Sequence, residues 1–110
     1  MAGSNLFTGT LDLLMLQTLK WGAKHGYGIG KWIGEQTGGA VDLDEGALYS
    51  ALHRLEKKGL ITGSWGETDT GRRARFYALT KKGGKSLEKE TARWEEHAGA
   101  VFAVLRHSEN

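Results

Sequence analysis

The sequence predicts a mainly helical α+β fold in which three helices precede a two-stranded hairpin and one long final helix. Three observations predict this order. Apolar residues recur at helical spacing in three segments before residue 59, and two β-branched and aromatic runs flank a turn near residue 70. After residue 80, apolar residues follow one another in steps of three and four, which is typical of a helix with one apolar side.

The composition is that of one small folded domain. The chain has 110 residues, of which 39% are hydrophobic and 25% charged, and this is enough apolar material for a single core. Cysteine is absent, so disulfide frameworks are excluded and a reducing, cytoplasmic location is expected. The N-terminus lacks a signal-peptide pattern, and the longest apolar run, at residues 100–105, is far too short to cross a bilayer. No membrane partner is therefore expected.

The first two helices are predicted over residues 8–22 and from the break at residues 22–26 to Gln36. The first contains LDLLMLQTL at residues 11–19, which is apolar around most of its circumference, and Thr8 can begin it. The second has apolar residues at mixed spacing of three and four. The chain has 17 glycines and no proline, so its breaks are expected at glycines.

The third helix, predicted over residues 45–58, has the clearest start and end signals. Its first amides can be capped by Asp42 together with Glu45, or by Asp44 alone. Lys57 and Lys58 complement the helix dipole in its last turn. The stripe expected to face the core consists of Leu48, Leu52 and Leu55, with Ala51 at its edge.

The opposite side of this third helix is polar and predicts an outward, contact-making face. Hydrogen-bond donors of several lengths lie along it, and such a face fits a binding surface better than a core. The residues of this face are Gly46, Ser50, His53 and Lys57, flanked by Tyr49 and Arg54.

A β-hairpin is predicted from residues 60–66 (LITGSWG) and 74–79 (ARFYAL), joined by a turn that contains Gly71. The net charge is only +2, but it is unevenly distributed. Residues 72–85 include six basic side chains and no acid, whereas residues 1–64 carry six of each sign. Positive charge is therefore concentrated at the hairpin, which is typical of a surface that meets a polyanion.

The final helix, predicted over residues 81–106 with Thr80 as its cap, has an apolar seam at heptad spacing. A helix that extends past a small core with an apolar seam requires a partner, and a second copy of the chain is the simplest one. The predicted dimer interface consists of Leu11 and Leu14 of the first helix with Leu87, Thr91, Trp94, Ala98, Val101 and Leu105.

This order of elements is that of a winged helix-turn-helix protein, in which the second helix of the motif enters the major groove and a basic hairpin meets the adjacent backbone. We therefore expect a DNA-binding domain at residues 1–80 and a dimerisation helix at residues 81–110. Short helices with a hairpin also occur in winged-helix adaptors that bind protein and not DNA. The small number of cations on the third helix favours that alternative.

Several segments resemble the PadR family of bacterial transcriptional regulators, in its short form with one C-terminal helix. The resemblance rests on LFTGTLDLLMLQTL at 6–19, HGYGI at 25–29, EGALYSALHRLEKKGLI at 45–61, WG at 65–66 and GRRARFYALTKKG at 71–83. It implies a homodimeric repressor that binds a palindromic double-stranded DNA operator through its third helix and wing, and that small aromatic or amphipathic effectors release from DNA.

The predicted DNA contacts come from the third helix and the hairpin. Each has an alternative explanation: Tyr49 could pack on the wing, Arg54 could pair with Glu45 or Glu56, and Lys57 could serve only the helix dipole. Ser50 departs from the resemblance, because the family often has proline there, so operator preference could differ. The predicted contact residues are Tyr49, Ser50, His53, Arg54, Lys57, Arg72, Arg73 and Arg75.

Trp94 resembles a tryptophan that lines a flat pocket between subunits in a multidrug-sensing branch of the family, so an effector site is one hypothesis for it. Its heptad position explains it equally well. Trp21, Trp32 and Trp65 are expected to pack in the core or an interface. The four histidines do not fall at ligand spacing and no nucleophile motif is present, so neither a metal, nor a cofactor, nor an enzymatic activity is predicted.

Overall fold

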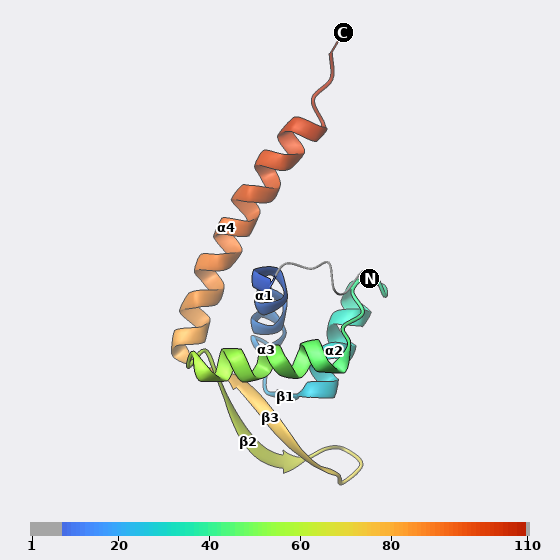
Figure 1. Ribbon diagram of the computed structural model, residues 1–110, viewed down its shortest axis with the longest axis vertical. Helices are drawn as coiled ribbons and strands as arrows, with labels where there is room; N and C mark the ends of the chain where they lie inside the picture. The colour runs from blue at the N-terminus through green and yellow to red at the C-terminus, as the bar shows by residue number, and fades with distance from the viewer. Residues whose placement is uncertain (1–7, 110) are drawn as a thin grey trace.

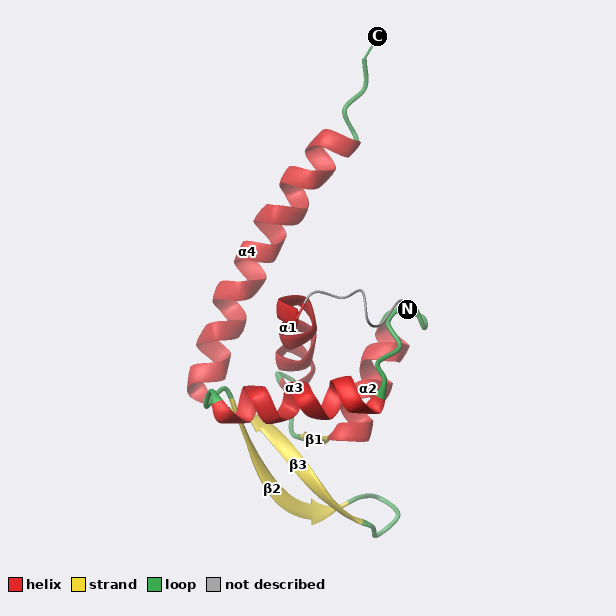
Figure 2. Cartoon of the chain, viewed as in Figure 1, coloured by secondary structure: helices red, strands yellow, loops and turns green. Residues whose placement is uncertain are grey.

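The computed structural model describes residues 8–109 and confirms the predicted fold class (Figures 1 and 2). The expected DNA-binding domain (residues 1–80) begins outside the described residues, and the expected dimerisation helix (residues 81–110) ends outside them. The segment 6–19 that carries part of the family resemblance also begins outside them. The elements are α1 (Thr8–Leu19), β1 (Lys24–His25), α2 (Gly26–Gln36), α3 (Glu45–Lys57), β2 (Ile61–Glu67), β3 (Arg73–Leu79) and α4 (Lys81–Leu105).

The sheet has three antiparallel strands in the order β1-β3-β2, one more than the hairpin predicted from the sequence. β2 pairs with β3 from Ile61 opposite Leu79 to Glu67 opposite Arg73, so the hairpin strands match in length. β1 has only two residues, and it pairs Lys24 with Tyr77 on the other edge of β3. A two-residue strand is too short to produce an alternating pattern, so no local sequence signal identifies it.

Side-chain caps fix the starts of three helices. The Asp44 carboxylate accepts a hydrogen bond from the Ala47 amide at 2.8 Å, so Asp44 is the cap of α3, and the alternative start at Asp42 is not used. Thr80 caps α4 as predicted, with its hydroxyl 3.0 Å from the Gly83 amide. α2 is capped by the His25 imidazole, which accepts from the Gly28 amide.

α1 ends at Leu19, three residues before the predicted end at residue 22. The Lys20 amide bonds to the Gln17 carbonyl and the Gly22 amide to the Leu19 carbonyl, each a tighter i to i−3 bond. Gly22 then adopts a φ of 133°, which turns the chain toward β1. The helix therefore stops because its last turn tightens into a glycine turn.

The core lies between α1, α2, α3, the start of the hairpin and the first turns of α4. The predicted stripe of α3 is confirmed, because all four of its residues are buried. Trp32 packs against the core, whereas Trp21 and Trp65 are 65% and 60% exposed, so neither of these two packs in the core, and an interface for them stays a prediction. The core residues are Met15, Leu16, Leu19, Ile29, Ile33, Leu48, Ala51, Leu52, Leu55, Ile61, Tyr77 and Leu87.

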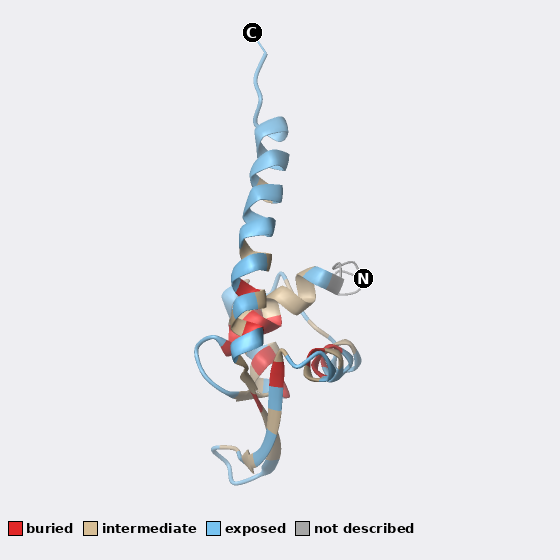
Figure 3. Cartoon of the chain, turned by 90° about the vertical axis from the view of Figure 1, so that its left-hand side faces the viewer, coloured by how far each residue is buried: buried red, intermediate tan, exposed pale blue. Residues whose placement is uncertain are grey.

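α4 joins the core only at its beginning and then runs away from the body (Figure 1). Gly83 and Leu87 are its buried residues, and Figure 3 shows its remaining turns almost entirely exposed. The protein therefore measures 62 Å along its longest axis but 28 and 21 Å across the others. Within residues 8–109, no helix combines the length and the apolar character needed to span a membrane.

Candidate nucleic-acid interface

The outward face of α3 carries four of the predicted contact residues together. Tyr49, Ser50, His53 and Lys57 are all exposed, and the buried stripe on the other side of the helix holds this face outward. The Asp44 cap and the buried stripe both fix α3 in place, so these side chains project from a rigid helix. A rigid helix positions recognition groups more precisely than a loop does.

Tyr49 is both exposed and supported by α2. Its side chain is 46% exposed. A Cβ atom placed on Gly26, the first residue of α2, would lie only 2.9 Å from the Tyr49 hydroxyl oxygen. Gly26 therefore permits the ring to lie against the start of α2. The alternative for this residue was packing on the wing; the contact found here is with α2 instead, and about half of the side chain stays available.

Arg54 is directed toward α1 and not toward the acidic neighbours proposed for it. Its Nη2 lies 2.5 Å from Asp12 Oδ1 and its Nε donates to Asp12 Oδ2 at 3.4 Å. The arginine and aspartate side chains are 31% and 17% exposed, so this bidentate pair is largely covered. The guanidinium thus joins α3 to α1, and the sequence separation of 42 residues explains why no local pattern indicates it.

The three hairpin arginines occupy different environments. Arg72 and Arg73 are exposed near the turn. The Arg73 guanidinium carbon lies 4.7 Å from the centre of the Trp65 ring, which places a cation over an exposed indole. Arg75 lies further from the turn and donates to the Glu56 carboxylate of α3 at 2.7 Å. Two of the three cations are therefore presented outward, and the third connects the hairpin to α3.

The electrostatics of this junction follow from its contacts. The hydrogen bond that Arg75 donates to the Glu56 carboxylate raises the pKa of the Arg75 guanidinium, and burial opposes that rise. Burial raises the pKa of the neighbouring Tyr77 hydroxyl, and the positive charge of Arg75 lowers it in part. Both side chains therefore keep their ordinary protonation states at neutral pH, arginine charged and tyrosine neutral.

The predicted seam of α4 divides into two parts. Leu87 is 5% exposed and belongs to the core of its own subunit, so it departs from the predicted dimer interface, since almost none of it is left for a partner to cover. Leu11 and Leu14 of α1 are also half-buried against this core. Further along α4, Thr91 and Ala98 are half-buried, and Trp94, Val101 and Leu105 are 40%, 42% and 70% exposed. The Trp94 ring meets the His97 ring edge-on at 5.7 Å.

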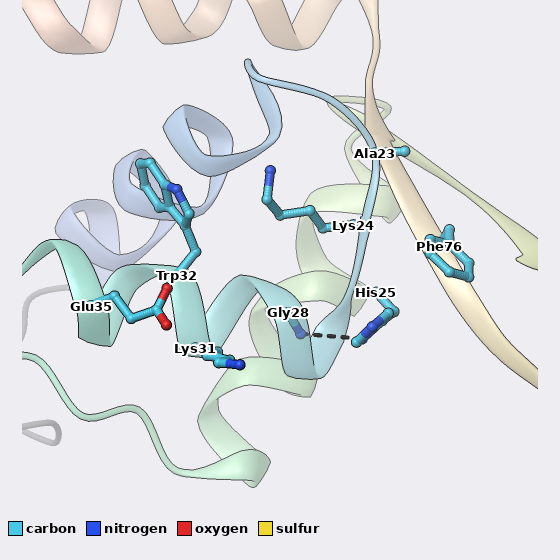
Figure 4. A pocket seen from close by; sticks show the side chains of 8 residues that line it. All are labelled: Ala23, Lys24, His25, Gly28, Lys31, Trp32, Glu35 and Phe76. Atoms are coloured by element: carbon cyan, nitrogen blue, oxygen red, sulfur yellow. Dashed lines mark hydrogen bonds between the residues drawn. The ribbon is translucent and has the colours of Figure 1, made fainter. Parts of the chain in front are cut away.

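A shallow cavity of about 300 Å³ lies beside β1 and the start of α2 (Figure 4). The Lys24 ammonium is 6.0 Å from the centre of the Trp32 ring in its wall, and His25 is occupied in capping α2. Lys31 and Glu35 bring opposite charges to the same wall. Among residues 8–109, no group of three His, Asp or Glu side chains could hold a metal ion. Lys24, Trp32 and His25 of this cavity thus already make contacts within the chain, and the predicted DNA-contact residues lie on α3 and the hairpin.

Comparison with protein families places most of this structure in one of them. The model of the "Transcriptional regulator PadR-like family" matches residues 15–89, which extend from α1 to the third turn of α4. An uncharacterized protein from Lysinibacillus sphaericus is 29% identical over 87% of this chain and 88% of its own. A protein of a Streptomyces fradiae transposon, also uncharacterized, is 37% identical over 86% of this chain, which spans only 26% of that relative.

Solved structures give the same result. A transcriptional regulator from Clostridium thermocellum is 33% identical, with a TM-score of 0.77 over 84% of this chain and 90% of its own. A PadR family transcription regulator from Clostridium difficile is 29% identical, with a TM-score of 0.74 over 88% of this chain and 98% of its own. A PadR-like transcriptional regulator from Bacillus cereus is 25% identical, with a TM-score of 0.80 over 91% of this chain and 95% of its own.

Proposed function

The chain belongs to the PadR-like family of transcriptional regulators, and from this premise we propose that it is a homodimeric, sequence-specific DNA-binding repressor. The observation that carries this proposal is the direct contact between α3 and the cationic face of the hairpin. The Arg75–Glu56 pair joins the outward face of α3 to the face of the hairpin that carries Arg73. One surface therefore combines a rigid helix with exposed cations.

In this proposal α3 enters the major groove, whose width admits a helix, and its outward side chains meet base edges. Tyr49 and Ser50 lie near the N-terminal end of α3, where a recognition helix reaches bases, so they are assigned to sequence discrimination. His53 and Lys57 follow on the same face toward the flanking backbone. Arg54 would act from the edge of this face, where its pair with Asp12 holds it against α1.

The hairpin acts as the wing and provides phosphate contacts that do not depend on sequence. Within the described residues, neither Arg72 nor Arg73 forms an ion pair, so their charges are available to a polyanion. Arg75 contributes mainly through its position, because its guanidinium is already bound to Glu56. The wing therefore supplies affinity, and α3 supplies specificity.

We assign the two predicted parts of the chain to separate tasks, DNA binding to residues 1–80 and dimerisation to residues 81–110. The exposed seam of α4 from Trp94 to Leu105 pairs with its copy in a second subunit. A twofold axis then presents two α3 helices to successive major grooves, about one helical turn apart, which requires a palindromic operator.

The effector hypothesis concerns Trp94, which is 40% exposed and lies on the seam. If two subunits pair along α4, their indoles approach the axis, where a flat aromatic effector could stack between them and alter the spacing of the two α3 helices. A planar dye titrated into the dimer should quench tryptophan fluorescence and release DNA. Quenching that is unchanged in Trp94→Ala would remove this assignment.

The test of DNA binding is a titration of the DNA directly upstream of the chain's own coding region, measured by fluorescence anisotropy between 50 and 200 mM salt. If each subunit neutralises about three phosphates, affinity should fall about a thousandfold across this range. Arg73→Ala should weaken binding to all DNA sequences and reduce the salt dependence, whereas Ser50→Ala should change which sequence is preferred. Arg93→Ala is the matched control, because it removes an arginine from the exposed part of α4.

The alternative function, a winged-helix adaptor that binds protein, makes the opposite prediction in the same experiment. Such an adaptor would form a stable complex with a protein partner, and adding it would not change the fluorescence anisotropy of any DNA fragment. Binding of the upstream fragment without salt dependence would also contradict the phosphate contacts assigned to the wing.

A further inference from the structure

A connected row of side chains runs along one face of the wing and ends on α3. The register pairs Trp65 with Arg75 and Gly63 with Tyr77, and alternate residues of a strand share a face, so these side chains and Arg73 lie on one side of the sheet. The Arg75 guanidinium carbon lies 5.9 Å from the ring centres of both Trp65 and Tyr77. The Arg73 guanidinium carbon lies 4.7 Å from the centre of the same Trp65 ring, so this indole is within contact distance of two cations.

Gly63 provides the space that this row needs. A Cβ atom on Gly63 would lie 2.6 Å from Arg75 Nε and 2.8 Å from its guanidinium carbon. The Arg75 side chain therefore lies flat across a strand position that has no side chain of its own. From there its Nη2 reaches Glu56 of α3 at 2.7 Å.

Glu56 is well placed to receive this contact. It lies about 20° from Tyr49 around α3, at the edge of the outward face that borders the wing. Its side chain is 33% exposed and that of Arg75 is 35% exposed, so both groups are about two-thirds covered. An isolated surface ion pair orders little, but a planar guanidinium that also contacts two rings has few alternative positions.

Building on the proposed function, we propose that Glu56, Arg75 and Trp65 are positioning residues for DNA binding. Glu56 and Arg75 fix the orientation of the wing relative to α3, and Trp65 holds the Arg73 guanidinium where it meets the phosphate backbone. Because these side chains are ordered before DNA binds, binding loses less conformational entropy.

Charge and position predict opposite outcomes for Glu56→Gln, which makes the proposal testable. Glu56 is an acid beside a surface that binds phosphates, so its charge alone opposes binding and its removal would tighten the complex. If Glu56 instead positions Arg75, its removal weakens the complex. Glu67→Gln is the matched control, because Glu67 lies on the same wing face opposite Arg73 and forms no ion pair within residues 8–109.

The first experiment uses the free protein and no DNA. Heteronuclear NOE values of the arginine Nε–H groups report how mobile each guanidinium is. In the wild type Arg75 should be as ordered as the backbone, with Arg72 as the mobile reference. In Glu56→Gln the Arg75 value should fall toward that of Arg72. A wild-type Arg75 as mobile as Arg72, or an Arg75 unaffected by Glu56→Gln, would overturn the proposal.

The second experiment measures affinity for the upstream DNA fragment at one salt concentration. We expect Glu56→Gln to weaken binding about fivefold, which is the size of effect expected from losing a partly exposed ion pair such as Arg75–Glu56. Glu67→Gln should leave binding equal or tighter. Trp65→Phe should weaken binding less than Glu56→Gln does, because phenylalanine keeps a ring but attracts cations less strongly. Thermal unfolding of each variant separates loss of position from loss of fold.

The outcomes distinguish this proposal from the function on which it rests. Wild-type protein that does not bind the fragment even at 50 mM salt contradicts DNA binding, and the NOE measurement then decides alone whether Glu56 orders Arg75. Wild-type protein that binds, with a Glu56→Gln variant that binds as tightly or more tightly, leaves the function intact and overturns the positioning role.

Discussion

The beginning and the end of α4 belong to one helix but have different surroundings. In the first two turns, Gly83 and Leu87 are buried against the body of the subunit. In the last three turns no side chain is buried, although several of them are apolar (Figure 3). Val104 and Leu105 are 76% and 70% exposed, and Val101 and Phe102 are each more than 40% exposed. The fold of one subunit thus explains the first part and gives no reason for the apolar residues of the second.

This difference teaches that one regular helix can serve two separate purposes. Substitutions in the first part should change the free energy of unfolding of the subunit. Substitutions in the second should change how subunits associate and leave the subunit fold intact.

Gly83→Ala should have the largest effect, a loss of about 4 kcal/mol in the free energy of unfolding, because the added methyl group has no space. Its Cβ would lie 1.9 Å from the Leu60 carbonyl oxygen and 2.9 Å from Leu79 Cδ1, and the backbone oxygen cannot move aside. Urea denaturation measures the loss. Gly84→Ala is the control, since its Cβ would meet only Leu79 at 4.0 Å. Equal stability of the two variants would contradict tight packing at the start of α4.

Substitution of two seam residues in the second part, Val101→Asp together with Leu105→Asp, should weaken dimer formation by about 3 kcal/mol, since each apolar side chain loses its burial at the interface. Sedimentation at micromolar concentration should then give a species of 12.0 kDa, against twice that mass for the wild type. Ala103→Asp is the control, because residue 103 is on the opposite side of the helix. A wild type that sediments as a monomer would contradict the pairing of α4 helices.

The sequence predicted those features that depend on local patterns. The Thr80 cap and the buried stripe of α3 follow from signals within a few residues of each other and are confirmed, and Asp44 is one of the two caps that the sequence allowed for α3. The fold class of the chain followed from the order of the predicted helices and strands. The outward face of α3 also follows, because a helix with one buried stripe must expose its other side.

The remaining features depend on contacts between distant parts of the chain. Arg54 pairs with Asp12 across 42 residues and Arg75 with Glu56 across 19, and no periodicity indicates either partner. The heptad spacing of α4 misplaced Leu87, because the same spacing continues where the helix still packs on its own subunit. Trp65 was expected to pack in the core or an interface, but it is 60% exposed on the wing, with the Arg73 guanidinium carbon 4.7 Å from its ring centre.

Gly99→Ala should have a smaller effect of opposite sign, a gain of about 1 kcal/mol, since alanine favours helix over glycine by that amount. Apart from its chain neighbours and the backbone of its own helix, no atom of the subunit lies within 4 Å of the position of its Cβ. Urea denaturation and sedimentation should be measured together. If stability rises and dimerisation is unchanged, Gly99 lies outside the dimer seam of α4. If the dimer is lost, the partner helix passes close to this glycine.

Lys82→Met should have the smallest effect, a loss of about 0.5 kcal/mol, the contribution of one exposed hydrogen bond to a helix terminus. The Lys82 ammonium donates to the Lys58 carbonyl at the end of α3, at 3.0 Å, so the start of α4 satisfies a group that α3 leaves unpaired. Methionine keeps the hydrocarbon part of the side chain and removes only the donor and its charge. Lys81→Met removes the same charge from the neighbouring exposed position and should leave the urea midpoint unchanged. If both variants behave alike, charge alone accounts for the loss; if only Lys82→Met loses stability, the first turn of α4 helps to hold the end of the helix that presents the contact residues.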